Sequence, residues 1–303
     1  MFNIKSIYFY FLAIQITLIK FFKKIYFSTN YYNKSLLSKI PQQFYFHPNP
    51  FLLSTITNYK KHLFKVSEID PNDFWKKSKN ISTERELHSF LWLNLIDRKN
   101  DGKSLQKIIN IWILKNSNYK RYVWESSVLS KRIISWILNV DIILNNGFFD
   151  FKRRFLQSII SQTNHLKKNI KFEKNYSKKI EILTALMLSG LVFKEYEENY
   201  KISIKEIENL VKNFFDKDGF PYSRNPSDLI IFSKYLLLCK ECIKDAQKYV
   251  PEFLDNIIEK NLICIKNILT PDNEVPLFNG SVKEDLGEFD KFLKNLDYKV
   301  KNK

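Results

Sequence analysis

The chain has 303 residues, of which 45% are hydrophobic and 16% aromatic, and this composition excludes a globally disordered protein. Its formal net charge is +17, from 49 Lys and Arg against 32 Asp and Glu. The excess is nearly all lysine spread along the chain, which is typical of solvated helix faces, so nucleic-acid binding is not favoured. A basic surface would still attract an acidic polymer such as a glycan. Charge alone therefore does not decide the function.

The N-terminal segment is apolar and then basic. Residues 7–18 are mostly apolar, but Gln15 interrupts the run and Lys20 follows it, so the run is short for a bilayer span. No small-residue cleavage site follows, and residues 21–32 are basic and aromatic. We expect a helix that packs on the domain or lies on a membrane surface, with membrane association through residues 7–26. Cytoplasmic and periplasmic locations both stay open.

From Thr83 onward, apolar residues recur at helical spacing, and strand-like alternation is scarcely seen. Helices are expected at about residues 83–95, 105–113, 124–145, 151–166, 182–196, 204–215, 226–242 and 251–269. Thr83 and Glu86 could form a capping box for the first of them, and residues 167–179 look like an exposed connection. Short polar breaks imply antiparallel neighbours, which can stack as a solenoid or close into a ring.

Aromatic, cysteine and histidine residues in these runs favour core packing over chemistry. The residues concerned are Trp92, Trp112, Trp136, Cys239, Cys242 and His88. The tryptophans lie in apolar stripes, and the CxxC pair has no second pair nearby. No carboxylate or cysteine lies at ligand spacing from His47, His62 or His88. We therefore expect no metal site and no cofactor.

The loop at residues 216–226 breaks the helical rhythm with chemically capable side chains. It contains the consecutive run Tyr222, Ser223, Arg224 and Asn225, directly before a proline that suits the first turn of a helix. Such a loop could bind an anionic, hydroxyl-rich ligand at the N-terminus of that helix. Alternatively, Asn225 or Ser223 caps the helix while Arg224 pairs with a surface carboxylate. Residue types alone favour this structural alternative.

The run DGFPYSRNP at residues 218–226 resembles the DGG-x-x-SR-[NS]-P segment of bacterial heparinase II/III-like proteins. Other segments resemble that family in the same order: residues 74–75, 87–93, 109–113, 124–127, 132–137, 271–272 and 277–280. The match covers roughly residues 46–280. The resemblance implies an all-α fold, an incomplete (α/α) toroid of antiparallel helical hairpins at 46–280. An apolar and basic segment, 1–45, would precede it, and a charged tail, 281–303, would follow.

Lyases of this family cleave uronic-acid glycans by β-elimination, which removes the C5 proton and breaks the C4–O bond. The reaction needs a group that neutralises the uronate and a proton carrier. The resemblance suggests Tyr222 as general base and acid, with Arg224 and Asn225 as carboxylate binders. A phenol has a pKa of about 10, so a tyrosine base needs a cationic neighbour such as Arg224. Asn164 and His165 resemble an Asn-His segment that supplies a uronate-binding Asn and sometimes a catalytic His, although a lone His there is more often structural.

Full-length family members continue into a β-sandwich that forms part of the cleft, and residues 282–303 show no strand-like alternation. We therefore expect the β-sandwich to be absent, so that the cleft lacks one wall. Three readings follow: a truncated or split member whose β-sandwich is a separately encoded partner, a degenerate glycan-binding remnant, or a minimal lyase. The expected ligand is an acidic polysaccharide or oligosaccharide, and the alternative to a lyase is a non-catalytic polyanion-binding module.

Overall fold

The computed structural model describes residues 4–57, 66, 69–76, 80–145, 149–272, 274–284 and 286–298. Every regular element within these ranges is helical, and the β-structure found there is an isolated antiparallel bridge between Phe215 and Pro221. The predicted all-α class is confirmed. His62 lies outside the described residues.

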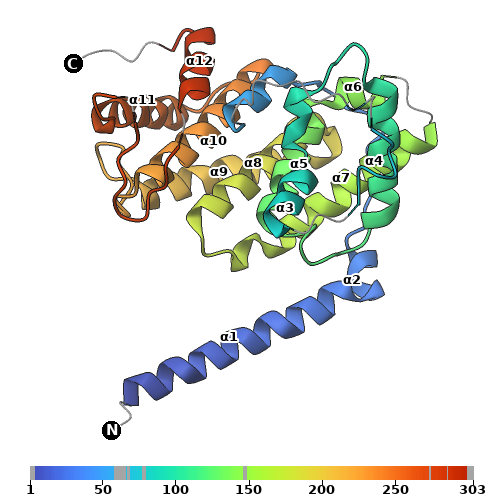
Figure 1. Cartoon of the computed structure of the whole chain (residues 1–303), viewed down its shortest axis with the longest axis horizontal. Coiled ribbons are helices and arrows are strands. Elements are labelled where there is room, and N and C mark those ends of the chain that lie inside the picture. The colour runs from blue at the N-terminus through green and yellow to red at the C-terminus, as the bar shows by residue number, and fades with distance from the viewer. Residues whose placement is uncertain are drawn as a thin grey trace.

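The elements fall in chain order as follows (Figure 1), where η marks a 3-10 helix. They are α1 (Ile4–Ser28), α2 (Asn30–Ser35), η1 (Pro50–Thr55), α3 (Ile81–Ser89), η3 (Leu91–Leu95), α4 (Gly102–Asn116), α5 (Ser126–Leu138), α6 (Val140–Leu144), α7 (Phe149–Asn169), η4 (Ile170–Phe172), α8 (Tyr176–Val192), η5 (Lys194–Tyr196), α9 (Glu197–Phe214), α10 (Pro226–Asp245), α11 (Glu252–Ile268) and α12 (Gly287–Asn295).

The body is a curved double layer of helices. Helices α3, α5, α8 and α10 pack side by side as the inner layer, while α7, α9 and α11 pack outside them. Burial explains this order: residues 180–192 of α8 are all buried, whereas α9 and α11 bury one stripe and expose the rest. Contacts between the first two turns of α5, α8 and α10 show that these three helices start at the same end. The arrangement is the predicted incomplete (α/α) toroid.

The two helical layers are held together by a close backbone contact and by a buried arginine. A Cβ added to Gly190 in α8 would lie 2.2 Å from the Tyr200 amide nitrogen of α9, so only glycine permits this packing. Arg132 of α5 is fully buried, and its guanidinium donates to Gln162 Oε1 at 2.6 Å and to the carbonyl oxygen of His88 at 2.8 Å. Burial lowers the pKa of Arg132. This arginine therefore ties α3 and α7 to α5, a role that the sequence did not reveal.

The aromatic core follows the prediction for two of the tryptophans. Trp112 and Trp136 are 0% exposed and meet edge to face with centroids 5.2 Å apart. The indole nitrogen of Trp112 donates to His88 Nδ1 at 2.9 Å, which gives His88 the expected packing role. Trp92 differs, because it is partly exposed and lines a pocket on the inner side of the ring.

Several helix boundaries differ from the predicted ones. The capping box of Thr83 and Glu86 is wrong, because Asn80 caps α3 by accepting from the Ser82 amide at 2.9 Å. The long helix expected at 124–145 is broken at Asn139, whose side chain bonds the carbonyl oxygen of Ser135 and divides α5 from α6. The expected connection at 167–179 is shorter, since α7 continues to 169 and α8 starts at 176.

Part of the expected charged tail is a packed helix. Phe289 and Phe292 of α12 are 3% and 2% exposed, and Phe292 stacks on Phe51 of η1 with centroids 5.3 Å apart. The apolar pair was hidden among charged neighbours in the sequence. The proposed domain boundaries stay a prediction, but the packed body extends beyond residue 280.

Candidate functional site

The loop between α9 and α10 is held in one shape by its neighbours. Gly219 has φ of 87°, and a Cβ there would lie 2.5 Å from Lys260 Cβ of α11. Both the backbone conformation and the lack of space therefore favour glycine at this position. The Lys260 ammonium donates to the carbonyl oxygen of Lys217 at 2.8 Å, and the Cys264 thiol to that of Asp218 at 3.3 Å. Helix α11 therefore supports the loop from outside.

Within this loop, Arg224 and Asn225 are already engaged. Arg224 Nη1 lies 2.7 Å from Asp216 Oδ2, and Asn225 Oδ1 accepts from the Ser227 amide at 2.9 Å, which caps α10. Burial raises the pKa of Asp216, but hydrogen bonds from the Phe220 amide and from Arg224 outweigh it and hold that pKa below its usual value. The structural alternative thus describes both residues. Tyr222, 62% exposed, is the exposed phenol of the loop, and its neighbours Ser223 and Arg224 are exposed as well.

The segment at residues 277–282 closes over the same loop. Asn279 Nδ2 donates to the carbonyl oxygen of Arg224 at 3.1 Å, and the Val282 amide donates to Ser227 Oγ at 3.0 Å. Ser223 and Ser177 each donate to Asp228 in the first turn of α10, at 2.8 and 3.2 Å. These bonds connect the loop to the first turn of α8.

Asn164 and His165 hold the N-terminal segment of the same chain. His165 is 3% exposed, and its Nδ1 lies 2.8 Å from the Tyr32 hydroxyl of α2. Asn164 Nδ2 donates to the carbonyl oxygen of Leu36 at 2.8 Å and to Ser38 Oγ at 2.9 Å. Burial, followed by the charges of Arg132 and Lys168, lowers the pKa of His165 to about 3. This placement favours a structural role over the predicted uronate-binding and proton-transfer roles.

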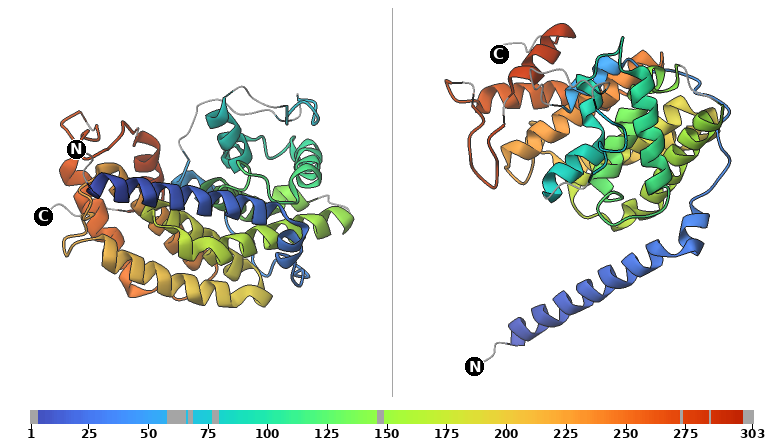
Figure 2. Two further views of the ribbon diagram at one scale, coloured as in Figure 1. Left: turned by 90° about the horizontal axis from the view of Figure 1, so that it is seen from below. Right: turned by 45° about the vertical axis from the view of Figure 1, so that its right-hand side comes forward.

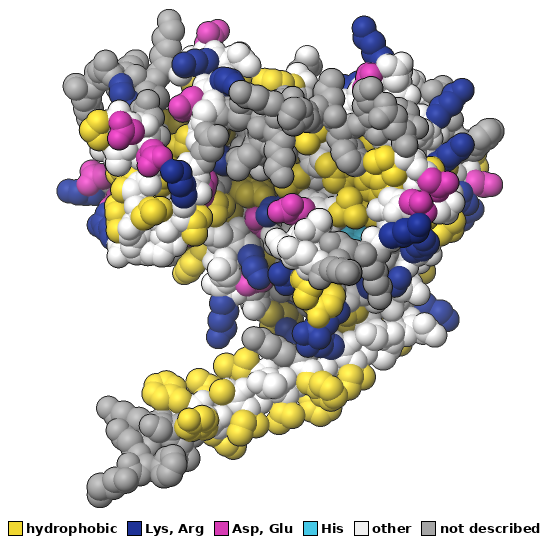
Figure 3. Space-filling model, in the orientation of Figure 1, with side chains coloured by type: hydrophobic (Ala, Val, Ile, Leu, Met, Phe, Trp, Pro, Cys, Tyr) yellow, Lys and Arg dark blue, Asp and Glu magenta, His cyan; other side chains and the backbone are white. Residues whose placement is uncertain are grey.

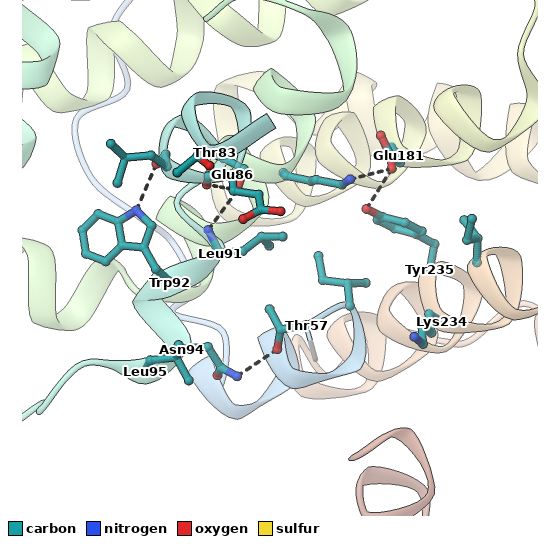
Figure 4. Close-up of a pocket in the computed structure, with 15 residues that line it drawn as sticks. Thr57, Thr83, Glu86, Leu91, Trp92, Asn94, Leu95, Glu181, Lys234 and Tyr235 are labelled. Atoms are coloured by element: carbon teal, nitrogen blue, oxygen red, sulfur yellow. Dashed lines mark hydrogen bonds and ion pairs between the residues drawn. The ribbon is translucent and has the colours of Figure 1, made fainter. Parts of the chain in front are cut away.

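The predicted residues therefore form two groups, one in the loop before α10 and one in the last turns of α7. The ring has a separate pocket on its inner side, of about 530 Å³, between the two arms of the curved layer (Figure 4). Its described lining contains none of the five predicted residues. The lining is Ile56, Thr57, Thr83, Glu86, Leu87, Ser89, Leu91, Trp92, Asn94, Leu95, Lys131, Glu181, Ile231, Lys234 and Tyr235. We call it the central pocket.

A buried carboxylate organises one wall of the central pocket. Glu181 of α8 is 7% exposed; its Oε1 lies 3.2 Å from Lys131 Nζ of α5 and accepts from the Tyr235 hydroxyl of α10 at 3.3 Å (Figure 4). Burial, with the negative charge of Glu181, raises the pKa of Tyr235 well above its usual value. Tyr235 is therefore a protonated donor at neutral pH, and three inner helices share one polar cluster.

Sequence reasoning missed this cluster because its members sit inside apolar runs. Lys131, Glu181 and Lys234 each lie next to apolar residues of an inner helix, although Ser130 and Arg132 also flank Lys131. A charged side chain is costly to bury without a partner, so a charge at such a position was the available signal. Lys234 Nζ lies 3.6 Å from Glu284 Oε2, which brings the segment before α12 to the pocket rim.

A second hollow, of about 450 Å³, lies where α1 meets the ring, and we call it the basic pocket. Its charged lining is Lys23, Lys24, Arg85, Arg121, Lys178, Glu125 and Glu173. Cations outnumber carboxylates, and Trp124, Tyr122 and Phe172 contribute aromatic surface. Such a lining suits an acidic sugar, because cations bind its carboxylate and rings pack on its apolar face. No group of three or more His, Cys, Asp or Glu side chains in the described ranges is placed to hold a metal ion.

The family model described as heparinase II/III N-terminus matches residues 100–298, about two thirds of the chain. The chain belongs to this family. Its fold is similar to that of a heparinase III gene product, with a TM-score of 0.57 and 18% identity over 80% of this chain and 42% of that one. It is also similar to the heparan sulfate lyase HepC of Pedobacter heparinus, with a TM-score of 0.54 and 16% identity over 82% and 46% of the two chains.

A further match is the DNA-directed RNA polymerase subunit beta'' of Marchantia polymorpha, 30% identical over 157 residues, which are 52% of this chain and 10% of that protein. The chain thus spans a tenth of this curated relative and less than half of each solved heparinase chain. At these identities the solved structures establish the helical fold, and the family model establishes the membership.

Proposed function

We propose that this chain is the helical domain of a polysaccharide lyase that acts on acidic, uronic-acid-containing glycans by β-elimination. The observation that carries the proposal is the central pocket of a heparinase-type helical ring, one wall of which holds the polar cluster of Lys131, Glu181 and Tyr235. The glycan would cross the ring where α5, α8 and α10 start, with an acidic group in the basic pocket. The described cations at this end favour a polyanion over a neutral polymer.

In this proposal Tyr222 is the proton carrier, because it is the exposed phenol of the loop that leads into α10. The phenolate takes the uronate C5 proton, the electron pair forms the C4–C5 double bond, and the C4–O bond breaks. The departing oxygen then takes the proton back from Tyr222, so no other reactant is consumed. Arg224 stabilises the negative charge of the phenolate and of the uronate. Asn225 offers its side-chain nitrogen to the uronate, while its side-chain oxygen caps α10.

The chain covers less than half of its solved relatives, so the second wall of the cleft is also a proposal. We place it in a β-sandwich domain, supplied by the same polypeptide or by a separately encoded one. The segment at residues 277–284, which reaches the loop and the central pocket rim, lies where such a domain would approach. The alternative is a non-catalytic glycan-binding module. The internal engagement of Arg224 and Asn225 favours neither function, because both use these side chains to hold the glycan.

The test incubates the purified chain with several uronate polymers, with and without a heparinase-type β-sandwich domain, and follows the ultraviolet absorbance of the unsaturated product. Tyr222→Phe should abolish product formation while binding persists, since only the proton carrier is lost. Tyr249→Phe, which alters an exposed phenol beyond the other end of α10, is the matched control. Glycan retention without product in any combination would instead establish the binding module.

A further inference from the structure

Helix α1 stands away from the ring for most of its length. Figures 1 and 2 show it leaving the body at α2 and projecting past the helical layers. Its last turns are anchored: Phe27 packs on Tyr119 and His165 with centroids 5.1 and 5.2 Å apart, and Lys23 Nζ lies 3.6 Å from the Phe172 ring centre. Of the two sequence-based expectations, packing of the whole helix on the domain is therefore wrong.

The projecting part of α1 exposes apolar side chains on most of its sides, and one row of them runs along its whole length. Phe11, Ile14, Leu18, Phe22 and Ile25 recur at three- and four-residue spacing, so they share one side of the helix. Their exposed fractions are 60%, 57%, 49%, 62% and 51%. Apolar side chains also run along the edge of α1 in Figure 3. A contiguous apolar strip left in water on this scale marks an interaction surface.

A narrow polar stripe runs beside this apolar row. Thr17, Lys24 and Ser28 form this stripe, about a quarter turn of the helix away from the row, and the two hydroxyls bond the helix backbone at Ala13 and Lys24. The helix contains four lysines and no acidic residue. Lys23 and Lys24 also line the basic pocket, so the positive charge of the helix continues onto the ring.

We propose that α1 docks this protein on an anionic lipid surface, with Phe11, Ile14, Leu18, Phe22 and Ile25 in the boundary between headgroups and acyl chains. Lysines at the ring end of the helix then meet the lipid phosphates. No described helix combines the length and apolar character needed to cross a bilayer, and the surface mode does not require it. A second copy of this chain is a poorer occupant, because each copy carries a charge of +17 and the copies repel.

The inference does not depend on the proposed lyase activity. Its test is co-sedimentation of the full chain with vesicles of phosphatidylglycerol and phosphatidylcholine, compared with vesicles of phosphatidylcholine alone. The wild type should bind the anionic vesicles and bind the neutral ones far more weakly. The double variant Phe11→Glu with Phe22→Glu should bind the anionic vesicles at least roughly a hundredfold more weakly, because two aromatic side chains no longer enter the lipid.

The matched control is Thr17→Glu with Ser28→Glu, which adds the same charge to the polar stripe and should retain most of the binding. All four positions are exposed, so the variants keep the folded body, and circular dichroism checks this. Failure of the wild type to sediment with anionic vesicles would overturn the proposal, as would equal loss in both double variants. Sedimentation velocity without lipid provides the last arm: a wild-type dimer that Phe11→Glu with Phe22→Glu converts to monomer would assign the face to a second copy.

Discussion

His165 Nδ1 and the Tyr32 hydroxyl lie 2.8 Å apart and join the last turns of α7 to α2 across 133 residues of sequence. Asn169 donates to the same hydroxyl at 3.1 Å, and Lys168 Nζ reaches the carbonyl oxygen of Ser35 at 2.7 Å. Phe27 completes the contact by packing on the imidazole. The Asn-His segment that the family resemblance assigned to the glycan therefore binds the protein's own N-terminal region and sets the direction in which α1 leaves the ring.

Tyr32→Phe should destabilise the protein by about 1 to 2 kcal/mol, because the buried imidazole and Asn169 both lose their partner while the ring packing stays. Urea denaturation followed by circular dichroism measures the change. Tyr31→Phe, at a neighbouring phenol that is 74% exposed, should leave the midpoint unaltered. Equal stability of both variants would show that the hydrogen bond contributes nothing.

Acid should destabilise the fold through His165. Its pKa is lowered to about 3 in the folded state, so the unfolded chain binds more protons wherever the pH lies between about 3 and the ordinary value of about 6.5. Stability due to this group is present above pH 6.5 and is lost as the pH falls, by about 2 kcal/mol between pH 7 and pH 5. Unfolding free energies measured across that range should show a shallower dependence in His165→Asn than in the wild type or in His47→Asn, which removes an exposed imidazole.

The helical ring could be predicted because its signal is local. Apolar residues at helical spacing fix each element, and short polar breaks make successive helices antiparallel. The boundary errors have physical causes in single side chains. Asn139 ends α5 by donating a side-chain hydrogen bond to the carbonyl oxygen of Ser135 in the preceding turn. Asn80, and not the expected Thr83, caps α3 by accepting from the Ser82 amide.

The site was harder to predict because its contacts span the ring. Arg224 and Asn225 were correctly flagged as capable of helix capping and ion pairing, but the residue types could not exclude ligand binding. The cluster of Lys131, Glu181 and Tyr235 joins three helices, so no segment read alone contains it. The sequence signal for this cluster was the presence of charged residues within apolar inner helices.

Arg132→Lys should be strongly destabilising although the substitution keeps the positive charge. The guanidinium bonds Gln162 and the carbonyl oxygens of His88 and Val123, and an ammonium cannot reach all three from one buried point. We expect a loss of about 3 to 5 kcal/mol, since buried acceptors are left without donors. Arg121→Lys, at an exposed arginine, should change stability by less than about 0.5 kcal/mol. Differential scanning calorimetry of the two variants would contradict this role for Arg132 if their melting temperatures matched.

Gly219→Ala should test whether the loop that presents Tyr222 needs its rigid shape. The added Cβ would lie 2.5 Å from Lys260 Cβ at a φ of 87°, so the loop or α11 has to move, at a cost of about 2 to 4 kcal/mol. Gly102→Ala is the control, because its Cβ would meet nothing nearer than 3.8 Å at the start of α4, and it should be neutral or slightly stabilising. Urea denaturation measures both. A loop that tolerates Gly219→Ala without loss would mean that α11 does not fix the position of Tyr222, and the proposed proton carrier would then lack the support that places it at the rim of the ring.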